Sequence, residues 1–242
     1  MSLYHSQHQC CLWPELFTVR ILKECGSALK EKLMNNCERR DQGIAYIGDA
    51  EVFAEMARCK KKLKVLNELD RWEYELIASA AKEVIPDSQE LAIVPPFYCE
   101  YGNHIKTGKN FFANYNCVLI DVAQITFGDN CLLGPNIAIY TAGHPLHPKT
   151  RASGYEYGKP VSIGNNVWIG GSTVIVPGVH IGDNAVIGAG SVVTKDIPAN
   201  VVAAGNPCHV IREITEDDRR KLFKNEEIDD EVWKIITASD QD

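Results

Sequence analysis

The sequence has no uninterrupted apolar segment close to the ~20 residues that a helix needs to span a bilayer. Its first residues also lack a basic leader followed by a long apolar core, so no signal peptide is predicted. Acidic residues outnumber basic ones, and the formal net charge of −7 disfavours sequence-independent nucleic-acid binding. These absences predict a cytoplasmic protein with neither a membrane nor a nucleic acid as partner.

The nine cysteines include no Cys-x-x-Cys pair, and their spacing is irregular. Both features disfavour a disulfide framework and a zinc ribbon, so reduced thiols are expected. Cys117 and Cys131 occur where a small apolar side chain would pack well. A short basic run, Lys60–Lys62 with Lys64, lies within helical spacing and predicts a solvated helix face.

What the sequence does contain is a period of six across residues 161–194 (VSIGNNVWIGGSTVIVPGVHIGDNAVIGAGSVVT). The residues two positions before each aliphatic are small or branched, and Phe127-Gly128, Leu133-Gly134 and Ile139 extend the frame toward the N-terminus. Glycine and asparagine follow several of the aliphatics, and they tolerate the positive φ of tight turns. The aliphatics that recur at every sixth position are Ile163, Ile169, Ile175, Ile181, Ile187 and Val193.

A period of six residues is a signature of a parallel β-helix. Three repeats would make one coil of about eighteen residues with a triangular section, and one aliphatic of each repeat would point inward. Hydrogen bonds would run between coils, so only the two ends would have open edges. A β-sandwich with coincidental spacing is the alternative, and six successive in-frame aliphatics disfavour it.

The flanking segments have helical patterns. Residues 1–43 predict an N-terminal helical extension, and 44–95 predict two helices, EVFAEMARCKKKLKVLNELD and RWEYELIASAAKEV, with Asp49 as N-cap of the first. The β-helix is predicted over 96–212, beginning after a Pro-Pro boundary. Residues 213–242 predict a charged amphipathic helix that caps the far end. The expected apolar stripes are Val52, Met56, Leu63 and Leu66 in the first helix and Trp72, Leu76 and Ile77 in the second.

The repeat stops over residues 140–160, and a segment of that length without periodicity is often functional. His144 and His147 lie in its first part, beside two prolines that stiffen the backbone. The residues alone leave open whether His144 is catalytic or a solvated loop residue. A structural or exposed role is expected for His147, and turn or surface positions are expected for His104, His180 and His209.

The sequence resembles the hexapeptide-repeat sugar O-acetyltransferases of the maltose, galactoside and nodulation-factor type. The resemblance covers roughly residues 50–214 and rests on PFYCEYGNHIKTGKNFFANYNCVLIDVAQITFGDN, GHPLH, GKPVSIGNNVWIGGSTVIVPGV and VIGAGSVVTKDIPANVVAAGNPCHVIREI. It implies a mainly β protein with a left-handed parallel β-helix, assembled as a homotrimer with active sites between subunits. It also implies acetyl-CoA as co-substrate, a sugar as acceptor and no metal.

Acetyl transfer from a thioester to a hydroxyl needs a general base, oxyanion donors and a groove for coenzyme A. The resemblance places the base at His144, whose residue type titrates near working pH, and acceptor contacts at Asn114 and Asp121. Glu156 or a backbone carbonyl is our candidate for fixing the His144 tautomer. The matched coenzyme A positions are Trp168, Gly170, Ser172, Ala189, Thr194, Lys195 and Arg212.

The N-terminal helical segment departs from the family pattern. An acidic position of the family falls near Tyr46, and an arginine of the family falls at Met56. In the family this segment contributes acceptor contacts, so the two departures bear on which acceptor is used.

Three other functions remain open at this stage. A xenobiotic acetyltransferase shares the loop histidine but usually carries a longer inserted loop. A metal hydratase of the γ-carbonic-anhydrase kind would need three histidines around one zinc at a subunit interface. A non-catalytic β-helix scaffold would only assemble subunits.

Overall fold

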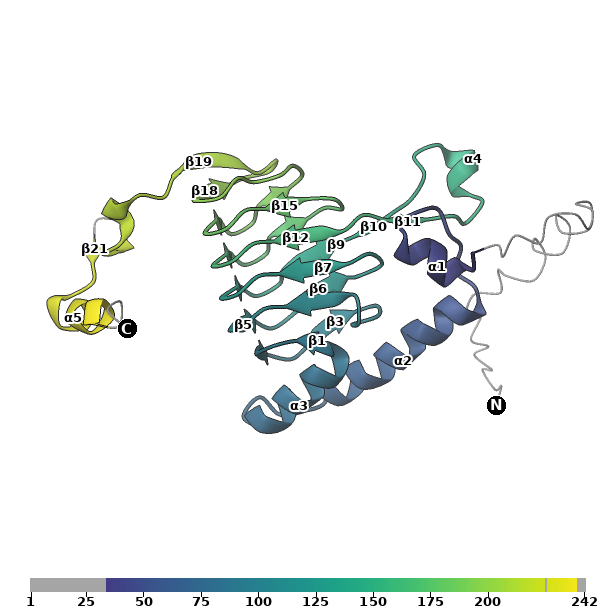
Figure 1. Ribbon diagram of the computed structural model, residues 1–242, viewed down its shortest axis with the longest axis horizontal. Helices are drawn as coiled ribbons and strands as arrows, with labels where there is room; N and C mark the ends of the chain where they lie inside the picture. The colour runs from purple at the N-terminus through teal and green to yellow at the C-terminus, as the bar shows by residue number, and fades with distance from the viewer. Residues whose placement is uncertain (1–33, 225, 239–242) are drawn as a thin grey trace, which may run out of the picture.

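A computed structural model describes residues 34–224 and 226–238. Most of the predicted N-terminal extension over 1–43 lies outside the described residues. Its last part forms a short helix, α1 (Asn36–Asp41), which is capped reciprocally by Asn35 and Glu38. Beyond α1, helices lie below a stack of β-coils (Figure 1).

The stack is a parallel β-helix with three faces, as predicted. The chain visits the faces in a constant order, and strands of successive coils pair in parallel. The first face contains β1 (Asp87–Ser88), β4 (Ile105–Thr107), β7 (Ile125–Phe127), β12 (Val161–Ile163) and β15 (His180–Ile181). The second contains β2 (Leu91–Ile93), β5 (Phe111–Ala113), β8 (Leu132–Leu133), β13 (Trp168–Ile169), β16 (Val186–Ile187) and β18 (Val201–Ala204). The third contains β3 (Phe97–Cys99), β6 (Cys117–Ile120), β9 (Ala138–Tyr140), β14 (Val174–Ile175) and β17 (Val192–Val193).

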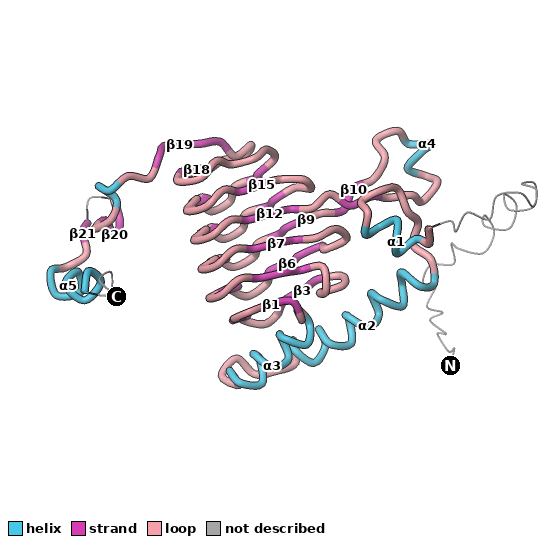
Figure 2. Tube along the Cα trace, in the orientation of Figure 1, coloured by secondary structure: helices cyan, strands magenta, loops and turns pink. Residues whose placement is uncertain are grey.

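The faces meet at three corners, which we name the first–second, second–third and third–first corners. The third–first corner follows each strand of the third face and comprises residues 100–104, 121–124, 141–160, 176–179 and 194–196. The tube in Figure 2 shows the short strands alternating with these turns. Because each corner is a column of turns, residues far apart in sequence are stacked there.

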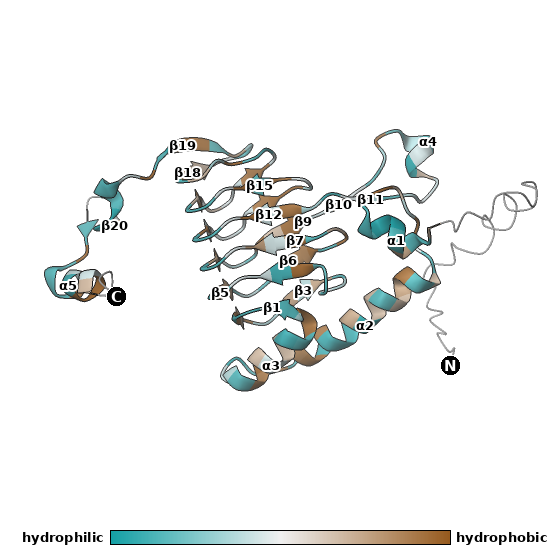
Figure 3. Ribbon diagram, viewed as in Figure 1, coloured by the Kyte–Doolittle hydropathy of each residue, from teal (hydrophilic) through white to brown (hydrophobic). Residues whose placement is uncertain are grey.

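The predicted inward aliphatics are all buried, from Ile163 at 3% exposed to Val193 at 0%. The residues two positions earlier, such as Val161 and Val167, are buried as well, so each repeat contributes two inward side chains rather than one. The reason is the alternation of side chains along a strand, which directs positions i and i−2 to the same side. Figure 3 shows the apolar character concentrated on the strands.

The coil that ends at β7 is longer than the regular coils above it. Thr107 pairs with Phe127, twenty residues later, whereas Ile163 pairs with Ile181, eighteen residues later. The longer coil widens at residues 121–124, which lie at the third–first corner. The lower coils therefore project further at this corner than the regular coils above.

Asparagines line the first–second corner as a ladder. Each has a positive φ between 52° and 60°, a region that asparagine enters more easily than other non-glycine residues. Their side-chain amides are hydrogen-bonded to one another from coil to coil at 2.7–2.9 Å. The turns are thus held both by backbone conformation and by side chains. The ladder consists of Asn110, Asn130, Asn166, Asn184 and Asn200.

The helices α2 (Ala50–Asn67) and α3 (Tyr74–Val84) lie against the lower end of the prism. Asp49 caps α2 as predicted, by accepting hydrogen bonds from two backbone N–H groups of the first turn. Of the apolar stripe predicted for α2, Val52, Leu63 and Leu66 are buried and Met56 is partly buried. The lysines of the predicted basic run are exposed.

The stripe predicted for the second helix is wrong at two positions. Trp72 is 71% exposed and Leu76 is 54% exposed, while Ile77, Ala81 and Val84 are buried. The helix begins at Tyr74 instead of 71 because residues 70–73 form a turn, and this shifts the buried face. Spacings of four and three residues put Ile77, Ala81 and Val84 on one side.

Both ends of the predicted β-helix domain differ from expectation. The boundary at 95/96 falls inside the first coil, because the Pro95-Pro96 pair forms the turn between β2 and β3. The predicted helix over 213–242 is replaced by β19 (His209–Glu213), η1 (Glu216–Asp218), the hairpin of β20 (Lys221–Phe223) with β21 (Glu226–Glu227), and α5 (Asp230–Ala238). Residues 239–242 lie outside the described part.

The upper end of the prism is closed by a strand, not by a helix. β19 pairs antiparallel with β18 and so covers the open edge of the second face. Helix α5 stands apart from the prism in Figure 1, so the capping role predicted for it is wrong. Its apolar residues Val232 and Ile235 are exposed.

The cysteines of the described residues are free thiols, in line with the expectation of reduced cysteines, and all are buried: Cys37, Cys59, Cys99, Cys117, Cys131 and Cys208. Burial raises the pKa of the Cys117 and Cys131 thiols to about 11. Both side chains pack inside the prism with no exposed surface, as predicted. Cys10, Cys11 and Cys25 lie outside the described residues.

Candidate active site

The interruption of the repeat forms a protruding loop at the third–first corner. After β9 the chain leaves the prism, and β10 (Ala142–Gly143) pairs antiparallel with β11 (Tyr157–Gly158) to form a short stalk. The helix α4 (Pro148–Arg151) forms the tip, visible at the upper right of Figure 1. The chain then rejoins the prism at β12. The loop thus begins and ends beside residues stacked below it at the same corner.

His144 follows the stalk directly, and its side chain is 57% exposed. Its Nε2 atom lies 3.8 Å from Oε2 of Glu156 on the returning strand. This is the contact that the sequence suggested for orienting the imidazole. His147 caps α4 through its backbone only and is exposed, consistent with the role expected for it.

Glu156 is joined to Tyr46 of the N-terminal segment by three hydrogen bonds. The two residues exchange backbone N–H···O bonds of 3.0 Å in both directions. The Tyr46 phenol also donates to Oε1 of Glu156 at 2.6 Å. Tyr46 is fully buried, and burial together with the Glu156 carboxylate raises its pKa well above the ordinary value. The phenol therefore remains a proton donor throughout the working pH range.

Arg40 of α1 is a buried cation at the same corner and was missed by sequence reasoning. Its side chain is 2% exposed and pairs with Glu55 at 2.6 Å and Asp41 at 2.8 Å. Its guanidinium lies 4.3 Å from the centroid of the Tyr101 ring. Burial opposes its charge, but the hydrogen bonds to Glu55 and Asp41 outweigh this and raise the pKa of Arg40.

The histidine at 104 is packed rather than simply exposed. Its ring stacks on Tyr101 at 4.8 Å between centroids, and its Nδ1 lies 2.7 Å from the backbone oxygen of Asp121. The side chain is 14% exposed. His104 therefore belongs to the wall beneath the loop. His180 and His209 are exposed, as expected for turn or surface residues.

Asp121 has a different environment from the one an acceptor contact needs. Its side chain is fully buried. One carboxylate oxygen accepts from the backbone N–H groups of Glu100 and Tyr101, and the other accepts from that of Gly102, at 2.7–3.0 Å. The geometry argues for a structural role in holding this turn, and the acceptor contact at Asp121 stays a prediction that would require these bonds to break.

Glu100 is the carboxylate that the turn presents, and sequence reasoning also missed it. Burial raises its pKa, Lys60 at 3.8 Å opposes this, and the charges of Asp121 and Glu156 raise it further. Its Oε2 atom is buried and has no hydrogen-bond partner among the described residues. The cation that faces this atom is the ammonium of Lys60 on α2.

The remaining predicted site residues are divided between two corners. Thr194 and Lys195 lie at the third–first corner with His144, and both are exposed. A second group lies at the second–third corner, on the opposite edge of the third face: Asn114, Gly170, Ser172 and Ala189. A single chain therefore does not bring the proposed base and Asn114 together.

Two coenzyme A positions have structural explanations of their own. A Cβ on Gly170 would lie 2.5 Å from the backbone nitrogen of Ala189, so close packing of the coils requires glycine there. Arg212 on β19 makes two bonds to Asp218, at 2.7 and 3.0 Å. Trp168 is 55% exposed on the second face. Their roles in binding coenzyme A stay predictions.

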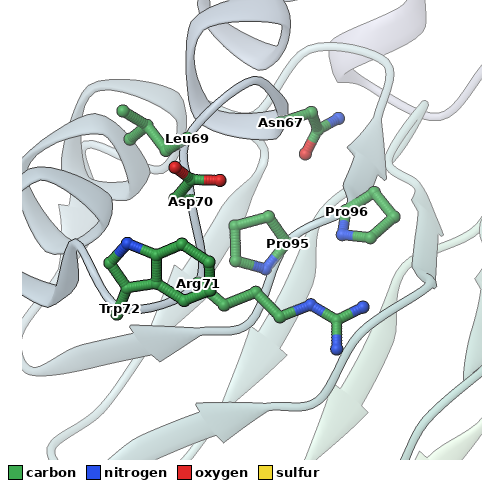
Figure 4. A pocket seen from close by; sticks show the side chains of 7 residues that line it. All are labelled: Asn67, Leu69, Asp70, Arg71, Trp72, Pro95 and Pro96. Carbon is green, nitrogen blue, oxygen red and sulfur yellow. The ribbon is translucent and has the colours of Figure 1, made fainter.

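A hollow of about 290 Å³ lies at the base of the second–third corner, between the α2–α3 connection and the first coil (Figure 4). Arg71, at its rim, lies 5.5 Å from the ring centroid of Tyr115, next to Asn114. The residues that line it are Asn67, Leu69, Asp70, Arg71, Trp72, Pro95 and Pro96. None of these is a predicted site residue.

Comparison with known proteins agrees with this architecture. Residues 160–195 match the family model described as the hexapeptide repeat of succinyl-transferase. A protein of Saccharomyces cerevisiae named as an acetyltransferase is 48% identical over 175 residues, which are 70% of this chain and 89% of that protein. The galactoside O-acetyltransferase of Escherichia coli K12 is 51% identical over 161 residues, which are 66% of this chain and 79% of that enzyme.

Solved structures extend the similarity to the fold. A galactoside acetyltransferase in complex with coenzyme A superposes with a TM-score of 0.77 at 44% identity, covering 81% of this chain and 99% of its own. A maltose O-acetyltransferase from Clostridium difficile 630 gives 0.74 at 47% identity, covering 76% and 99%. The chain belongs to the hexapeptide-repeat sugar O-acetyltransferase family.

The position where the resemblance implies an arginine holds Met56, which packs partly buried beside Tyr46 and Val52. The cation of this region is instead Arg40, which comes from α1 and pairs with Glu55, the neighbour of Met56. Position 40 carried no signal in the sequence, because the partner that fixes it lies on another helix.

Two features are absent from the described residues. Within the described ranges, no group of three or more His, Cys, Asp or Glu side chains is arranged to hold a metal ion. No helix among the described residues is long and apolar enough to cross a membrane. Family membership favours acyl transfer over the hydratase and scaffold alternatives, because the relatives are named as acetyltransferases.

Proposed function

We propose that this protein transfers the acetyl group of acetyl-CoA to a hydroxyl of a sugar of the galactoside or maltose kind. His144 acts as general base, and each active site lies between two subunits of a homotrimer. The similarity to a coenzyme A-bound galactoside acetyltransferase and to a maltose O-acetyltransferase supports the reaction and the acceptor class. The division of the site residues between two corners supports the shared site.

The outward side chains of the faces support the trimer. Within one coil, Ser162 is outward on the first face, Trp168 on the second and Val174 on the third. Other coils repeat this: His180 is polar on the first face, whereas Leu132 and Tyr98 are apolar on the second and third and are 49% and 47% exposed. Exposed apolar surface of this extent marks an interaction site.

A trimer with its third faces turned toward the three-fold axis would join the two corners. The second–third corner of one copy would then lie against the third–first corner of the next, which is a heterologous contact that closes after three copies. Asn114 of one subunit would approach the His144 loop of its neighbour. The acceptor would lie between them.

The reaction uses His144 as the base and also needs a hydrogen-bond donor for the oxyanion. The acceptor hydroxyl attacks the thioester carbonyl while His144 takes its proton, and the oxyanion then collapses with release of the coenzyme A thiolate, which receives the proton. Glu156 facing one imidazole nitrogen favours the tautomer that leaves the other nitrogen free to act as base. Such contacts are often long before substrate binds, so 3.8 Å is compatible with this role. Lys195 is free to meet coenzyme A phosphates, whereas Arg212 must first release Asp218.

The test is release of free thiol from acetyl-CoA across a panel of galactosides, maltose and glucose. We expect at least one sugar to accelerate thiol release, and His144→Ala to lower the rate about 10²–10⁴-fold. Unaccelerated release with every sugar, or full activity of His144→Ala, would contradict the proposal.

A further inference from the structure

We infer that Tyr46 is a positioning residue for the base: it holds the Glu156 carboxylate in place beside His144. The inference rests on the proposed function, because it assigns a role within the same site. Tyr46 lies 110 positions before Glu156 in the sequence, in the short segment between α1 and α2. The family position that falls near Tyr46 is acidic and concerns the acceptor, so the resemblance implies no role for a tyrosine there.

The contact between the two residues is built from both backbone and side chain. The antiparallel bridge fixes the Cα position of Glu156 through two hydrogen bonds of 3.0 Å. The phenol then fixes the carboxylate by donating to Oε1 at 2.6 Å. With Oε1 held, the second oxygen, Oε2, is the one that faces Nε2 of His144. The orientation of the base thus depends on a residue outside the loop.

The loop supplies little else to hold this carboxylate. Glu156 is 26% exposed and His144 is 57% exposed, so water competes for both. A glutamate has three rotatable side-chain bonds, and an exposed one samples several rotamers. A hydrogen bond from a residue on a rigid element restricts such a side chain to one orientation. The side chain can then orient the group next to it.

Tyr46 itself is held rigidly. It is fully buried in a small apolar cluster with Cys37, Val52, Tyr101 and Val122, which joins α1, α2 and the prism. Tyr101 in turn packs against the Arg40 guanidinium. The anchor of Glu156 therefore extends through packed side chains to the buried ion pair of Arg40 with Glu55.

The variant that tests this is Tyr46→Phe, which removes only the hydroxyl and keeps the buried ring and both backbone bonds. We expect kcat to fall about 10-fold, the scale on which loss of an orienting partner acts, with the KM for acetyl-CoA unchanged. Because Tyr46 acts through Glu156, the same change made in a Glu156→Ala background should lower kcat no further. Tyr155→Phe is the matched control, since its hydroxyl has no partner among the described residues and is one position from Glu156.

A second readout does not depend on the acceptor. Nitrogen-15 NMR of labelled histidine, assigned with His144→Gln, reports the tautomer of His144 in the protein without substrates. We expect one tautomer to dominate in the native protein and Tyr155→Phe, and a mixture in Tyr46→Phe and Glu156→Ala. If wild type turns over no sugar, the proposed function fails, and this comparison alone decides the inference.

The inference would be overturned by two results. Tyr46→Phe could keep the native kcat and the native tautomer, which would show that the phenol does not orient the site. Alternatively, its loss of kcat could be just as large in the Glu156→Ala background, which would show that Tyr46 acts by supporting the fold and not through Glu156. Melting temperatures of all four variants separate loss of folding from loss of orientation.

Discussion

At the scale of single residues, the third–first corner depends on side chains that hold backbone in place beneath the loop. Asp121 is the clearest case, because its two oxygens accept three backbone hydrogen bonds from the turn that presents Glu100. Without the carboxylate, the N–H groups of that turn lose their partners in a buried setting. Such unsatisfied groups cost more than the hydrogen bonds themselves contribute.

We therefore expect Asp121→Ala to lower the free energy of unfolding by about 3 kcal/mol, measured by denaturant unfolding. A residue that only contacts the acceptor would instead raise the acceptor KM and leave stability unchanged. Asp129→Ala is a useful comparison, because that side chain accepts from the single backbone N–H of Lys109 in an exposed turn. Equal stability of Asp121→Ala and the native protein would contradict the structural role.

Arg40 gives a second prediction at this scale. Arg40→Met removes a buried cation from Glu55 and Asp41, and we expect a loss of about 2 kcal/mol, below the range for fully buried pairs because both carboxylates reach solvent. Arg58→Met is matched to it: Arg58 also pairs with Glu55 but is 68% exposed. Its loss should be under about 0.5 kcal/mol, and similar losses for the two variants would contradict the account.

These residues show what sequence could and could not provide. His144 could be singled out because it lies in an interruption of a regular repeat and within a family motif. Arg40, Tyr46 and Glu100 could not, because each acquires its role from a partner on another element, as far as 110 positions away for Tyr46. Asp121 was matched to the acceptor through the family resemblance, and its burial was not visible in the sequence.

At the scale of elements, the turns of the first–second corner determine how the coils stack. Each asparagine of the ladder adopts a positive φ and also bonds to the asparagine of the next coil. Alanine at such a position would lose both contributions, since it resists positive φ by about 1–2 kcal/mol. Glycine would lose only the hydrogen bonds.

Asn184 is a suitable site to test this, because it is exposed and contributes nothing to the core. We expect Asn184→Ala to destabilise the protein by about 2 kcal/mol. Asn184→Gly should destabilise it by about 1 kcal/mol less than Asn184→Ala does. Denaturant unfolding of the two variants side by side measures the difference. Equal stability of the two would show that backbone strain is not what asparagine relieves here.

The same scale shows why some elements were predictable. The six-residue period directly reports which side chains face the core, so the strands and their register follow from it. The buried face of α3 could not be predicted from its own periodicity. A turn at residues 70–73 delays the start of the helix, and as a result Trp72 and Leu76 lie at the surface. The C-terminal segment was misjudged because β19 closes the sheet edge by backbone pairing, which leaves no periodic pattern.

At the scale of the whole molecule, the three faces have different surfaces and so different partners. Ser162 and Val174 occupy equivalent outward positions in one coil, on the polar first face and the apolar third face. A buried interface tolerates a charge poorly, whereas a solvated face accepts it. The assembly should therefore be sensitive to a charge on one face only.

We expect Val174→Glu to convert the trimer to monomers and to abolish activity, and Ser162→Glu to leave the trimer intact. Light scattering after size-exclusion chromatography measures the mass of each variant. If both variants remained trimers, the third face would not be the interface. If the native protein were already a monomer, the assembly proposed here would be wrong.

The central claim is that each active site combines Asn114 of one subunit with His144 of the next, and mixing the two inactive variants tests it most directly. Asn114→Ala and His144→Ala, tagged differently and refolded together, should each be impaired alone. Random assembly would restore about one quarter of the sites, because each needs one intact residue from each neighbour. In the doubly tagged trimers one site of the three has both intact residues, so recovery of about one third of the native thiol release in that fraction supports the shared site. Activity no higher than that of the parent variants would contradict it.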